Sequence, residues 1–576
     1  MEEDLTPADN DAAPFKDLER SDLESDARAG RQMGIAAIII TAFLALGRVM
    51  GIGKEVVLSS LGAGRHTDAY KIAYNSVIYT IYTKVEKLMR PTYLPEFVRV
   101  RREEGEEAAW DVTSVMTGFQ FVLLLILAAL CVIFAEPLLL LVGAGLADSP
   151  EDLHRGVVML RIMAPALVLF SLSVMPELTL HAYKRFTLPA VAEAAFRTAL
   201  VVIFVVLVAL LWPGRPKDAV YGAAWAVLIG GSIRFLVQLP GLWSKLRMFR
   251  FTADVWRNPH ARTVLRLMPP VVLGLIFATL RTWADSRFGS VIGEGVYTCL
   301  DFARKIPDVL LQTLALAVSF VVYPFLSEWA IRGEKDKMAD ALVTMTRAMA
   351  FIFIPVSAAL MIASLPLIQL MYQHGGFTSE QADLSALGVY WYSPGLFFSA
   401  LDAPINHWYF ALKDTTTPNV MGVVFVIVHI LISYFGVYHL GATPKAKLSW
   451  VAAALTISKT GKILVLYAML RGRIGKINRA AVVSFAVKLA ICTGVMVIAL
   501  LLANQQATPM LETMLAGRGG VKLQSLAELA MNFAVAVVVL LGVAAALHIE
   551  ELSIVSQALR KVTGKIAGKL GRGRGK

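Results

Sequence analysis

The sequence contains few charged residues for its length. Asp, Glu, Lys and Arg make up 17% of its 576 residues, whereas 57% are hydrophobic and the mean hydropathy is +0.62. Soluble chains carry about 25% charged residues and do not need long apolar runs. The shortage of charge excludes a soluble multidomain enzyme and predicts an all-α protein that crosses a bilayer many times.

Cysteine is scarce too, and motifs of membrane enzymes are missing. The three cysteines, Cys131, Cys299 and Cys492, lie in apolar segments, so neither a disulfide framework nor a cysteine-based zinc site is indicated. The chain has no HExxH motif, and its SKTGK segment (458–462) lacks the glycine spacing of a P-loop. We expect no enzyme activity, no metal and no cofactor, and transport driven by sodium, by protons or by the membrane potential.

Fourteen stretches of about 20 mainly apolar residues are candidate membrane spans. They cover residues 34–61, 68–96, 110–134, 156–182, 188–212, 219–243, 263–286, 296–326, 340–372, 384–412, 418–438, 448–470, 481–503 and 525–548. If both ends of the chain lie in the cytoplasm, the inside loops and the C-terminal tail hold 25 Lys and Arg residues and the outside loops hold nine. Because cytoplasmic loops carry the excess of cations, this distribution predicts that both termini are cytoplasmic.

Charged segments flank the spans. The first 32 residues contain ten acidic residues and no apolar run, which is unlike a signal peptide and predicts a disordered cytoplasmic tail (1–32). Residues 244–262 and 549–576 are basic and predict a cytoplasmic linker and a second cytoplasmic tail. Topology thus explains the net charge of +12, and no nucleic-acid partner is expected. Two tails of opposite charge also leave open a non-transporting scaffold that recruits partners.

The chain contains an internal repeat of 229 residues. Four pairs of prolines have this separation: Pro95 and Pro324, Pro137 and Pro366, Pro165 and Pro394, and Pro189 and Pro418. Because the offset covers six spans, both copies have the same orientation, as in many secondary transporters with a substrate site between two lobes. We predict two parallel six-helix lobes, 33–243 and 263–471, around a central cationic cavity, followed by two extra helices within 472–548.

Ionisable residues lie well inside several spans. A Lys or Arg in the middle of a lipid-facing helix costs about 2.5–3.5 kcal/mol, so these residues must face a hydrated cavity or one another. Arg281 and Asp285 are four residues apart, as are Asp301 and Lys305. Each pair can therefore neutralise itself on one helix face.

Other cations lack such a partner. Arg48, Lys54 and Arg304 have no obvious one, since Glu55, next to Lys54, is expected to point to another face. Lys84 lies near the inner end of its span, where a long side chain can reach the headgroups. A surplus of cations in a central cavity suits a phosphate or pyrophosphate group and argues against a transporter for cationic drugs.

The first span also contains three closely spaced glycines. Gly47, Gly51 and Gly53 lie within LGRVMGIGK. Glycine permits bending or close approach of helices, so we expect this helix to hinge during alternating access.

Several segments resemble one known family. GRVMGIGKEVVLSSLGAGRHTDAYKIAYN (47–75) and RPTYLPEF (90–97) are similar to the signature of the MurJ/MviN lipid II flippases, and DFARKIP (301–307), YPFLSEW (323–329) and QHGGFT (373–378) match later blocks. This family is part of the multidrug, oligosaccharidyl-lipid and polysaccharide exporter superfamily. The resemblance implies a flippase that moves an undecaprenyl-pyrophosphate-linked muropeptide to the outer leaflet of a bacterial inner membrane. It also implies that the last two helices form a groove for the lipid tail.

The resemblance assigns roles to single residues. Arg48, Lys54, Glu55 and Arg304 match charged cavity positions, and Asp68 matches a gate position. Lys54 and Glu55 stand where relatives usually have Arg and Asp, so the charges are kept but the planar guanidinium fork is lost. The full set of candidate substrate-binding residues is Arg48, Lys54, Glu55, Lys84, Arg281 and Arg304.

Two departures indicate a divergent member of the family. Ile81 stands where relatives usually have a cavity arginine, and we expect Lys84, one turn later, to supply the charge. After Pro418, His429 and Ser433 occupy positions at which relatives often carry sodium ligands. Because a histidine titrates near neutral pH, these two residues are candidates for coupling to protons or to the membrane potential. A buried, hydrogen-bonded His429 is the competing interpretation.

The sequence is also compatible with other lipid-linked substrates. Flippases for O-antigen, capsule or exopolysaccharide precursors would need the same cationic cavity, because those saccharides also carry a polyprenyl pyrophosphate. The expected partners are a lipid-linked saccharide and membrane lipids. We expect a monomer that works near the cell-wall synthesis machinery.

Overall fold

The structure of the protein, a computed structural model, describes residues 39–312, 325–476, 478–515 and 520–552. These ranges consist of helices and connections and contain no β-strand. Within them, nine helices are long and apolar enough to cross a membrane, or ten if the bent helix α10 counts as one span. The protein is therefore a helical multi-pass membrane protein, as predicted. The predicted acidic tail and the basic tail from residue 553 onward lie outside the described residues.

Within the described residues, each of the fourteen predicted spans contains one helix or several consecutive helices. The first half contains a helix over residues 39–59, then α2 (Arg65–Lys71), the π-helix η1 (Ile72–Ile78), α3 (Tyr79–Glu103), α4 (Glu106–Ile133), α5 (Ala135–Val142), α6 (Pro150–Leu172), α7 (Val174–Ala182), α8 (Thr187–Leu211) and α9 (Pro216–Gln238). The second half contains α10 (Pro259–Ile292), α11 (Val296–Leu310), a helix over residues 325–332, α13 (Lys335–Ile362), α14 (Ser364–Tyr372), α15 (Ser379–Tyr392), α16 (Leu396–Ala411), α17 (Thr416–Phe435) and α18 (Pro444–Arg471). Two further helices follow, α19 (Arg479–Leu515) and α20 (Gly520–Ala546).

Helix boundaries repeat at the same interval as the prolines. The break between α4 and α5 at Phe134 corresponds to the break between α13 and α14 at Ala363, 229 residues later. Lys184 and Lys413, also 229 residues apart, both have a left-handed backbone with φ of 59°. At both ends the amide of the following residue reaches back five residues to a helix carbonyl, at 2.8 and 2.9 Å, as in a Schellman motif. The sequence repeat is therefore a repeat of structure.

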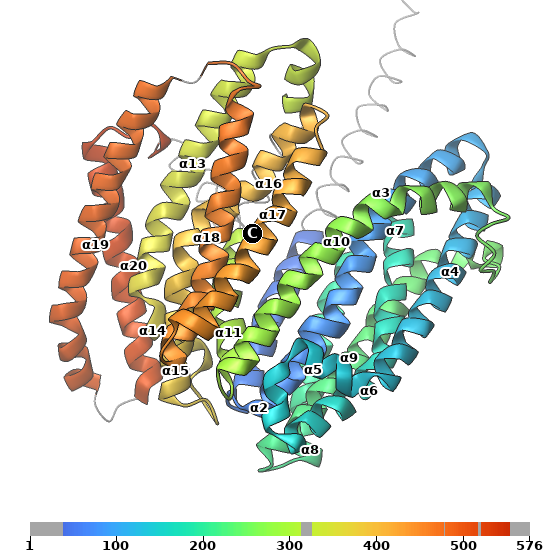
Figure 1. The fold of residues 1–576 in the computed structure, drawn as a ribbon, viewed down its shortest axis with the longest axis horizontal. Coiled ribbons are helices and arrows are strands. Elements are labelled where there is room, and N and C mark those ends of the chain that lie inside the picture. Colours follow the sequence, from blue (N-terminus) through green and yellow to red (C-terminus); the bar gives the residue numbers. More distant parts are fainter. Residues whose placement is uncertain (1–38, 313–324, 477, 516–519, 553–576) are drawn as a thin grey trace, which may run out of the picture.

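Figure 1 shows two helical bundles side by side, which correspond to the two predicted lobes except that α10, predicted to begin the second lobe, contacts both bundles. The first contains α2 to α9 and the second α11 to α18, and α10 packs against α3 of the first lobe and α17 of the second. The lobes meet where α2 contacts α11 and diverge towards the opposite end (Figure 1). We call the end at which α2 meets α11 the closed end.

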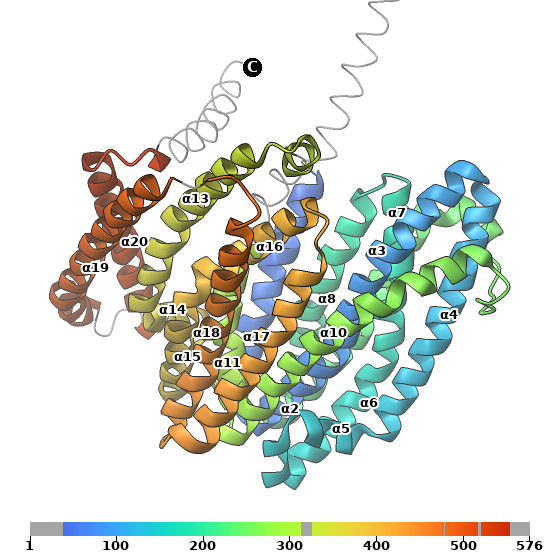
Figure 2. The ribbon, with the colours of Figure 1, turned by 45° about the horizontal axis from the view of Figure 1, so that its top comes forward.

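The two extra helices belong to the second lobe by contact. Helices α19 and α20 pack against each other and against α13 and α14, on the side away from the first lobe (Figure 2). An ion pair of 2.6 Å between Arg347 on α13 and Glu551, just beyond α20, fixes one end of this arrangement. The groove for a lipid tail along these helices stays a prediction.

Candidate functional site

A cavity of about 480 Å³ lies between the two lobes. Helix 39–59, η1, α3 and α8 form one side of it, and α11, α13 and α14 form the other. The charged side chains that line it are four cations and two carboxylates: Arg48, Lys54, Arg197, Lys305, Glu55 and Asp308. The cavity between the lobes therefore has an excess of positive charge, as predicted, and it offers donors that suit phosphate oxygens.

An ion-pair network joins the lobes beside this cavity, at the closed end. Glu55 pairs with Lys54 at 2.9 Å and with Lys71 at 3.2 Å. Lys71, whose side chain is 2% exposed, also pairs with Asp301 at 2.6 Å. Asp301 in turn pairs with Lys305 at 3.5 Å. Because Glu55 and Lys71 belong to the first lobe and Asp301 to the second, these contacts hold the two lobes together.

Asp68 forms a second connection between the lobes. Its buried carboxylate accepts hydrogen bonds from the backbone amides of Gly295 and Thr298, each at 2.8 Å, and from the Thr298 hydroxyl at 2.7 Å. These donors lie at the start of α11, where helix amides lack partners within the helix. Nearby, the backbone of Ala63 exchanges two hydrogen bonds with the side chain of Gln381, at 3.0 and 2.7 Å. The position of Asp68 suits a gate, and its role in gating stays a prediction.

Asp285 on α10 is the centre of a third cluster. One carboxylate oxygen pairs with Arg281 at 3.3 Å and with Arg304 at 3.2 Å, and the other lies 2.7 Å from Nε2 of His429. His429 and Ser433 are fully buried on α17, and neither His429 Nδ1 nor the Ser433 hydroxyl has a hydrogen-bond partner in the described part of the chain. The structure thus shows a buried, hydrogen-bonded histidine. Within the same described ranges, no group of three or more His, Cys, Asp or Glu side chains is arranged to hold a metal ion.

The expectation that Lys54 and Arg304 lack partners is wrong. Lys54 pairs with the neighbouring Glu55, because its long side chain reaches across the helix surface to a carboxylate that was expected to point away. Arg304 pairs with Asp285 on the facing helix α10, and with Asp308 one turn further along α11 at 3.7 Å. These cations are therefore held in place by carboxylates before any ligand binds.

Arg48 and Lys84 occupy different surroundings. Arg48 lines the cavity and donates a hydrogen bond of 3.4 Å to the backbone oxygen of Gln312. Lys84 lies half-buried on α3, within electrostatic range of Lys87 and of Arg281 on α10. It is not among the residues that line the 480 Å³ cavity, so its role in binding substrate stays a prediction.

Helix 39–59 runs without a break through its three glycines. A Cβ atom on Gly51 would lie 2.5 Å from Nη1 of Arg197 on α8, and one on Gly47 would lie 3.6 Å from Cα of Ala194. The nearest atom to a Cβ on Gly53 is 3.8 Å away. In this conformation Gly51 and Gly47 allow close packing on α8, and a hinge at the three glycines stays a prediction.

Sequence reasoning missed two cations of the site. Lys71 was not selected, although it is a lysine within an apolar run, a position that needs a buried partner. Arg197 was not selected either, although Glu193 lies one turn before it and pairs with it at 2.5 Å. The predicted pair of Asp301 and Lys305 does form, but Asp301 also binds Lys71 from the other lobe. For both Lys71 and Arg197, the sequence feature that could have identified them is a charged residue within a membrane span.

Comparison with known sequences gives one consistent result. A family model described as "Lipid II flippase MurJ" matches residues 57–516. The lipid II flippase MurJ of Burkholderia cenocepacia is 25% identical over 404 residues, which are 69% of this chain and 77% of that protein. The "Probable lipid II flippase MurJ" of Bdellovibrio bacteriovorus is 24% identical over 526 residues, which are 90% of this chain and 95% of that protein.

Solved structures share the fold. A structure of lipid II flippase MurJ in an inward closed conformation aligns with a TM-score of 0.68 and 21% identity, and covers 87% of this chain and 98% of its own. An inward-facing multidrug transporter of the MATE family aligns with a TM-score of 0.61 and 14% identity, over 76% of this chain and 98% of its own. These likenesses show that the two-lobed fold is shared.

Proposed function

The chain belongs to the lipid II flippase MurJ family, and from this membership we propose that it moves lipid II across a bacterial inner membrane by alternating access. The cargo is an undecaprenyl-pyrophosphate-linked muropeptide, which passes from the inner to the outer leaflet. The observation that carries the proposal is the cationic cavity between the lobes, beside a closed end joined by buried ion pairs.

The cavity offers the chemistry that a pyrophosphate requires. Arg48 and Arg197 can each present two N–H donors to phosphate oxygens, and Lys54 and Lys305 add compact positive charges. The two carboxylates in the lining offset only half of these four cations. Arg197 and Lys305 also pair with Glu193 and Asp301, which lie outside the lining, so a pyrophosphate binds these two cations in exchange for carboxylates.

The ion-pair network couples binding to opening. Lys54 and Lys305 line the cavity and also belong to the network that joins the lobes. A pyrophosphate that binds these two lysines competes with Glu55 and Asp301 for them. Lys305 also lies 3.9 Å from Glu55, which belongs to the other lobe. Competition for Lys305 weakens this contact, which exists only in the closed arrangement, so the bound substrate favours opening of the closed end. Lys71, which does not line the cavity, keeps both carboxylates paired and allows the lobes to close again.

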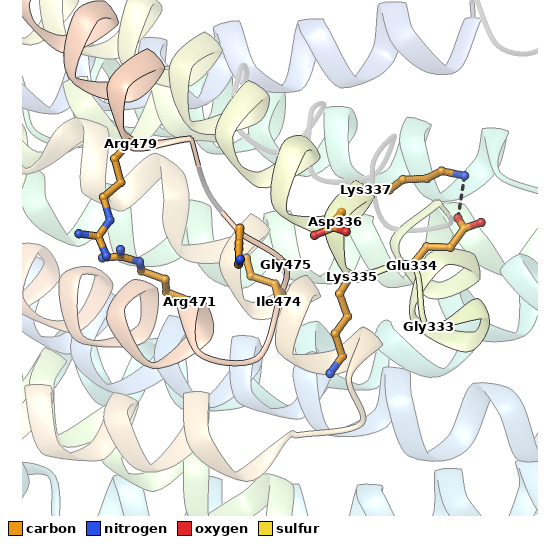
Figure 3. Close-up of a pocket in the computed structure, with 10 residues that line it drawn as sticks. Gly333, Glu334, Lys335, Asp336, Lys337, Arg471, Ile474, Gly475 and Arg479 are labelled. Carbon is orange, nitrogen blue, oxygen red and sulfur yellow. Dashed lines mark ion pairs between the residues drawn. The ribbon is translucent and has the colours of Figure 1, made fainter.

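The distribution of cations supports the orientation of the protein. At the end opposite the closed end, a pocket of about 1100 Å³ gathers Lys335, Lys337, Arg471 and Arg479 around the loop that leads to α19 (Figure 3). Because cytoplasmic loops carry the excess of Lys and Arg, this end faces the cytoplasm together with both termini. The closed end then faces the outer side, and the divergence of the lobes faces the cytoplasm.

His429 is the proposed coupling residue. Proton binding to its imidazole adds a positive charge next to Asp285, which already pairs with both Arg281 and Arg304. Three cations then share one carboxylate, so the two arginines are held less tightly and become better donors to an anionic ligand. This arrangement supports coupling to protons or to the membrane potential.

Depletion of the protein in its host tests the function. Access of lipid II to an external lipid II-cleaving toxin reports the leaflet in which it lies. We expect lipid II to accumulate in a toxin-protected form on depletion. Wild-type protein and the control Lys445→Gln, an exposed position on α18, should restore access, whereas Arg48→Gln, Lys54→Gln and Arg304→Gln should not.

The same experiment separates the alternatives. Unchanged access of lipid II to the toxin would contradict the proposal and point to another polyprenyl-linked saccharide, whose surface glycan should then be lost. A non-transporting scaffold would lose activity on deletion of the tails 1–32 and 553–576, whereas a transporter should keep it. We propose that the protein acts as a monomer near the cell-wall synthesis machinery.

A further inference from the structure

A second group of cations lies inside the second lobe, apart from the network at the closed end. Lys459 and Lys462 on α18 both pair with Asp402 on α16, and the Lys462 distance is 2.7 Å. One carboxylate cannot neutralise two ammonium groups, so this trio has a net positive charge. Arg281 on α10 lies within electrostatic range of Lys459 and adds to the excess.

These cations line two adjoining cavities. The larger, about 280 Å³, lies between α10, α16, α17 and α18 and includes Arg281, Lys459 and Lys462 in its wall. The smaller, about 190 Å³, shares Arg281 and Lys459 with it and is also lined by Arg304 and Asp308. Asp308 lines the 480 Å³ cavity as well. The three spaces are therefore neighbours that share lining residues.

Asn406 adds an unused hydrogen-bond acceptor to the larger cavity. Its Oδ1 is buried and has no partner among the residues that the structure describes. Buried acceptors are normally paired, so a ligand that donates an N–H group would satisfy this one. Phe277, Phe410 and Phe425 supply apolar wall. Cations, one free acceptor and apolar surface together suit a short peptide that ends in a carboxylate.

We propose that this pocket, formed by Arg281, Asn406, Lys459 and Lys462, binds the peptide part of the cargo through a peptide carboxylate. The inference rests on the proposed function, because the muropeptide of lipid II is the part that carries a peptide. The two lysines bind the carboxylate in partial exchange for Asp402, and Asn406 accepts a peptide N–H. Polyprenyl-linked saccharides without a peptide gain nothing from the pocket, so it selects lipid II among substrates with the same pyrophosphate.

Binding of two soluble short-chain analogues to the purified full-length protein in detergent tests the pocket. One analogue carries pyrophosphate, disaccharide and peptide, and the other lacks only the peptide. Charge-assisted hydrogen bonds support a preference of about tenfold for the peptide-bearing analogue. The double variant Lys459→Gln/Lys462→Gln should lose this preference and bind the peptide-free analogue like wild type. The control Lys445→Gln, on the same helix, should keep it.

Two further results decide between explanations. Equal binding of both analogues by the wild-type protein overturns the peptide pocket, and this comparison needs no variant to fold. If the lysines serve the ligand, Asp402→Asn should preserve or increase the preference, because it frees both of them. Loss of preference in folded Asp402→Asn, or its retention in the double variant, also overturns the pocket. Failure of the wild type to bind either analogue would contradict the proposed function itself, whereas equal binding contradicts the pocket alone.

Discussion

Replacement of Lys71 by Met tests whether the buried ion pairs hold the closed end together. Lys71 donates to Glu55 of its own lobe at 3.2 Å and to Asp301 of the other lobe at 2.6 Å. Met keeps most of the side-chain volume but leaves both carboxylates without this cation. Removal of one partner from a buried ion pair costs about 3–5 kcal/mol. Lys54 and Lys305 stay close to the carboxylates, at 2.9 and 3.5 Å, so we expect the lower end, about 3 kcal/mol.

This free-energy cost destabilises the closed arrangement of Lys71→Met, because the carboxylates are exposed to water in the open arrangement. A change of about 3 kcal/mol shifts the ratio of closed to open molecules by about a hundredfold. The assay uses a single cysteine at Ala63, a buried residue of the closed end, in a background where Cys131, Cys299 and Cys492 are alanine. The rate of labelling by a membrane-impermeant maleimide from the outer side should rise tenfold to a hundredfold in Lys71→Met.

Two controls complete this test. Lys217→Met, at an exposed position at the start of α9, should leave the labelling rate unchanged. The double variant Lys71→Met/Asp301→Asn should recover part of the closure, because one of the two uncompensated charges is gone. An unchanged rate in correctly folded Lys71→Met would refute the idea that the network closes the molecule.

Three other predictions concern transport measured by toxin access. Gly51→Leu should lower transport several-fold, because its Cβ would lie 2.5 Å from Nη1 of Arg197 and the longer side chain must displace this cavity cation. Gly53→Ala, with its nearest neighbour at 3.8 Å, should retain most activity. Normal transport in Gly51→Leu would count against both packing and hinge roles. His429→Gln removes the imidazole beside Asp285 but keeps an N–H donor, so transport should no longer respond to a proton gradient; a persistent response would place coupling elsewhere. Lys84→Ala should reduce transport about tenfold if one charge-assisted hydrogen bond to the cargo is lost, and full activity would contradict a binding role.

The two-lobed architecture could be predicted from the sequence because it depends on local physics. Apolar runs of helical length have few alternatives in a bilayer. The prolines recur at the offset at which helices later break, and Lys184 and Lys413 end equivalent helices with the same left-handed turn. These features are encoded in neighbouring residues, so a single chain reveals them.

The pairing of charges could be predicted only within a helix. Asp301 and Lys305, four residues apart, do pair. Lys71 and Asp301 are 230 residues apart, as are Asp68 and Thr298. These separations lie within one residue of the 229-residue repeat length, because α2 and α11 face each other where the two copies meet. No local pattern records that contact, but charged or polar partners separated by one repeat length would have been the signal to seek.

Reconstitution tests the central claim most directly. Purified protein is placed in liposomes that contain lipid II, and the fraction cleaved by external toxin is followed over time. With the wild-type protein, we expect the cleaved share of lipid II to exceed the share that starts in the outer leaflet and to approach completion. With Lys54→Gln/Arg304→Gln, we expect cleavage to stop at the share that starts in the outer leaflet. Cleavage that stops at the outer-leaflet fraction with correctly folded wild-type protein, while a peptide-free polyprenyl-pyrophosphate saccharide does cross, would contradict this claim.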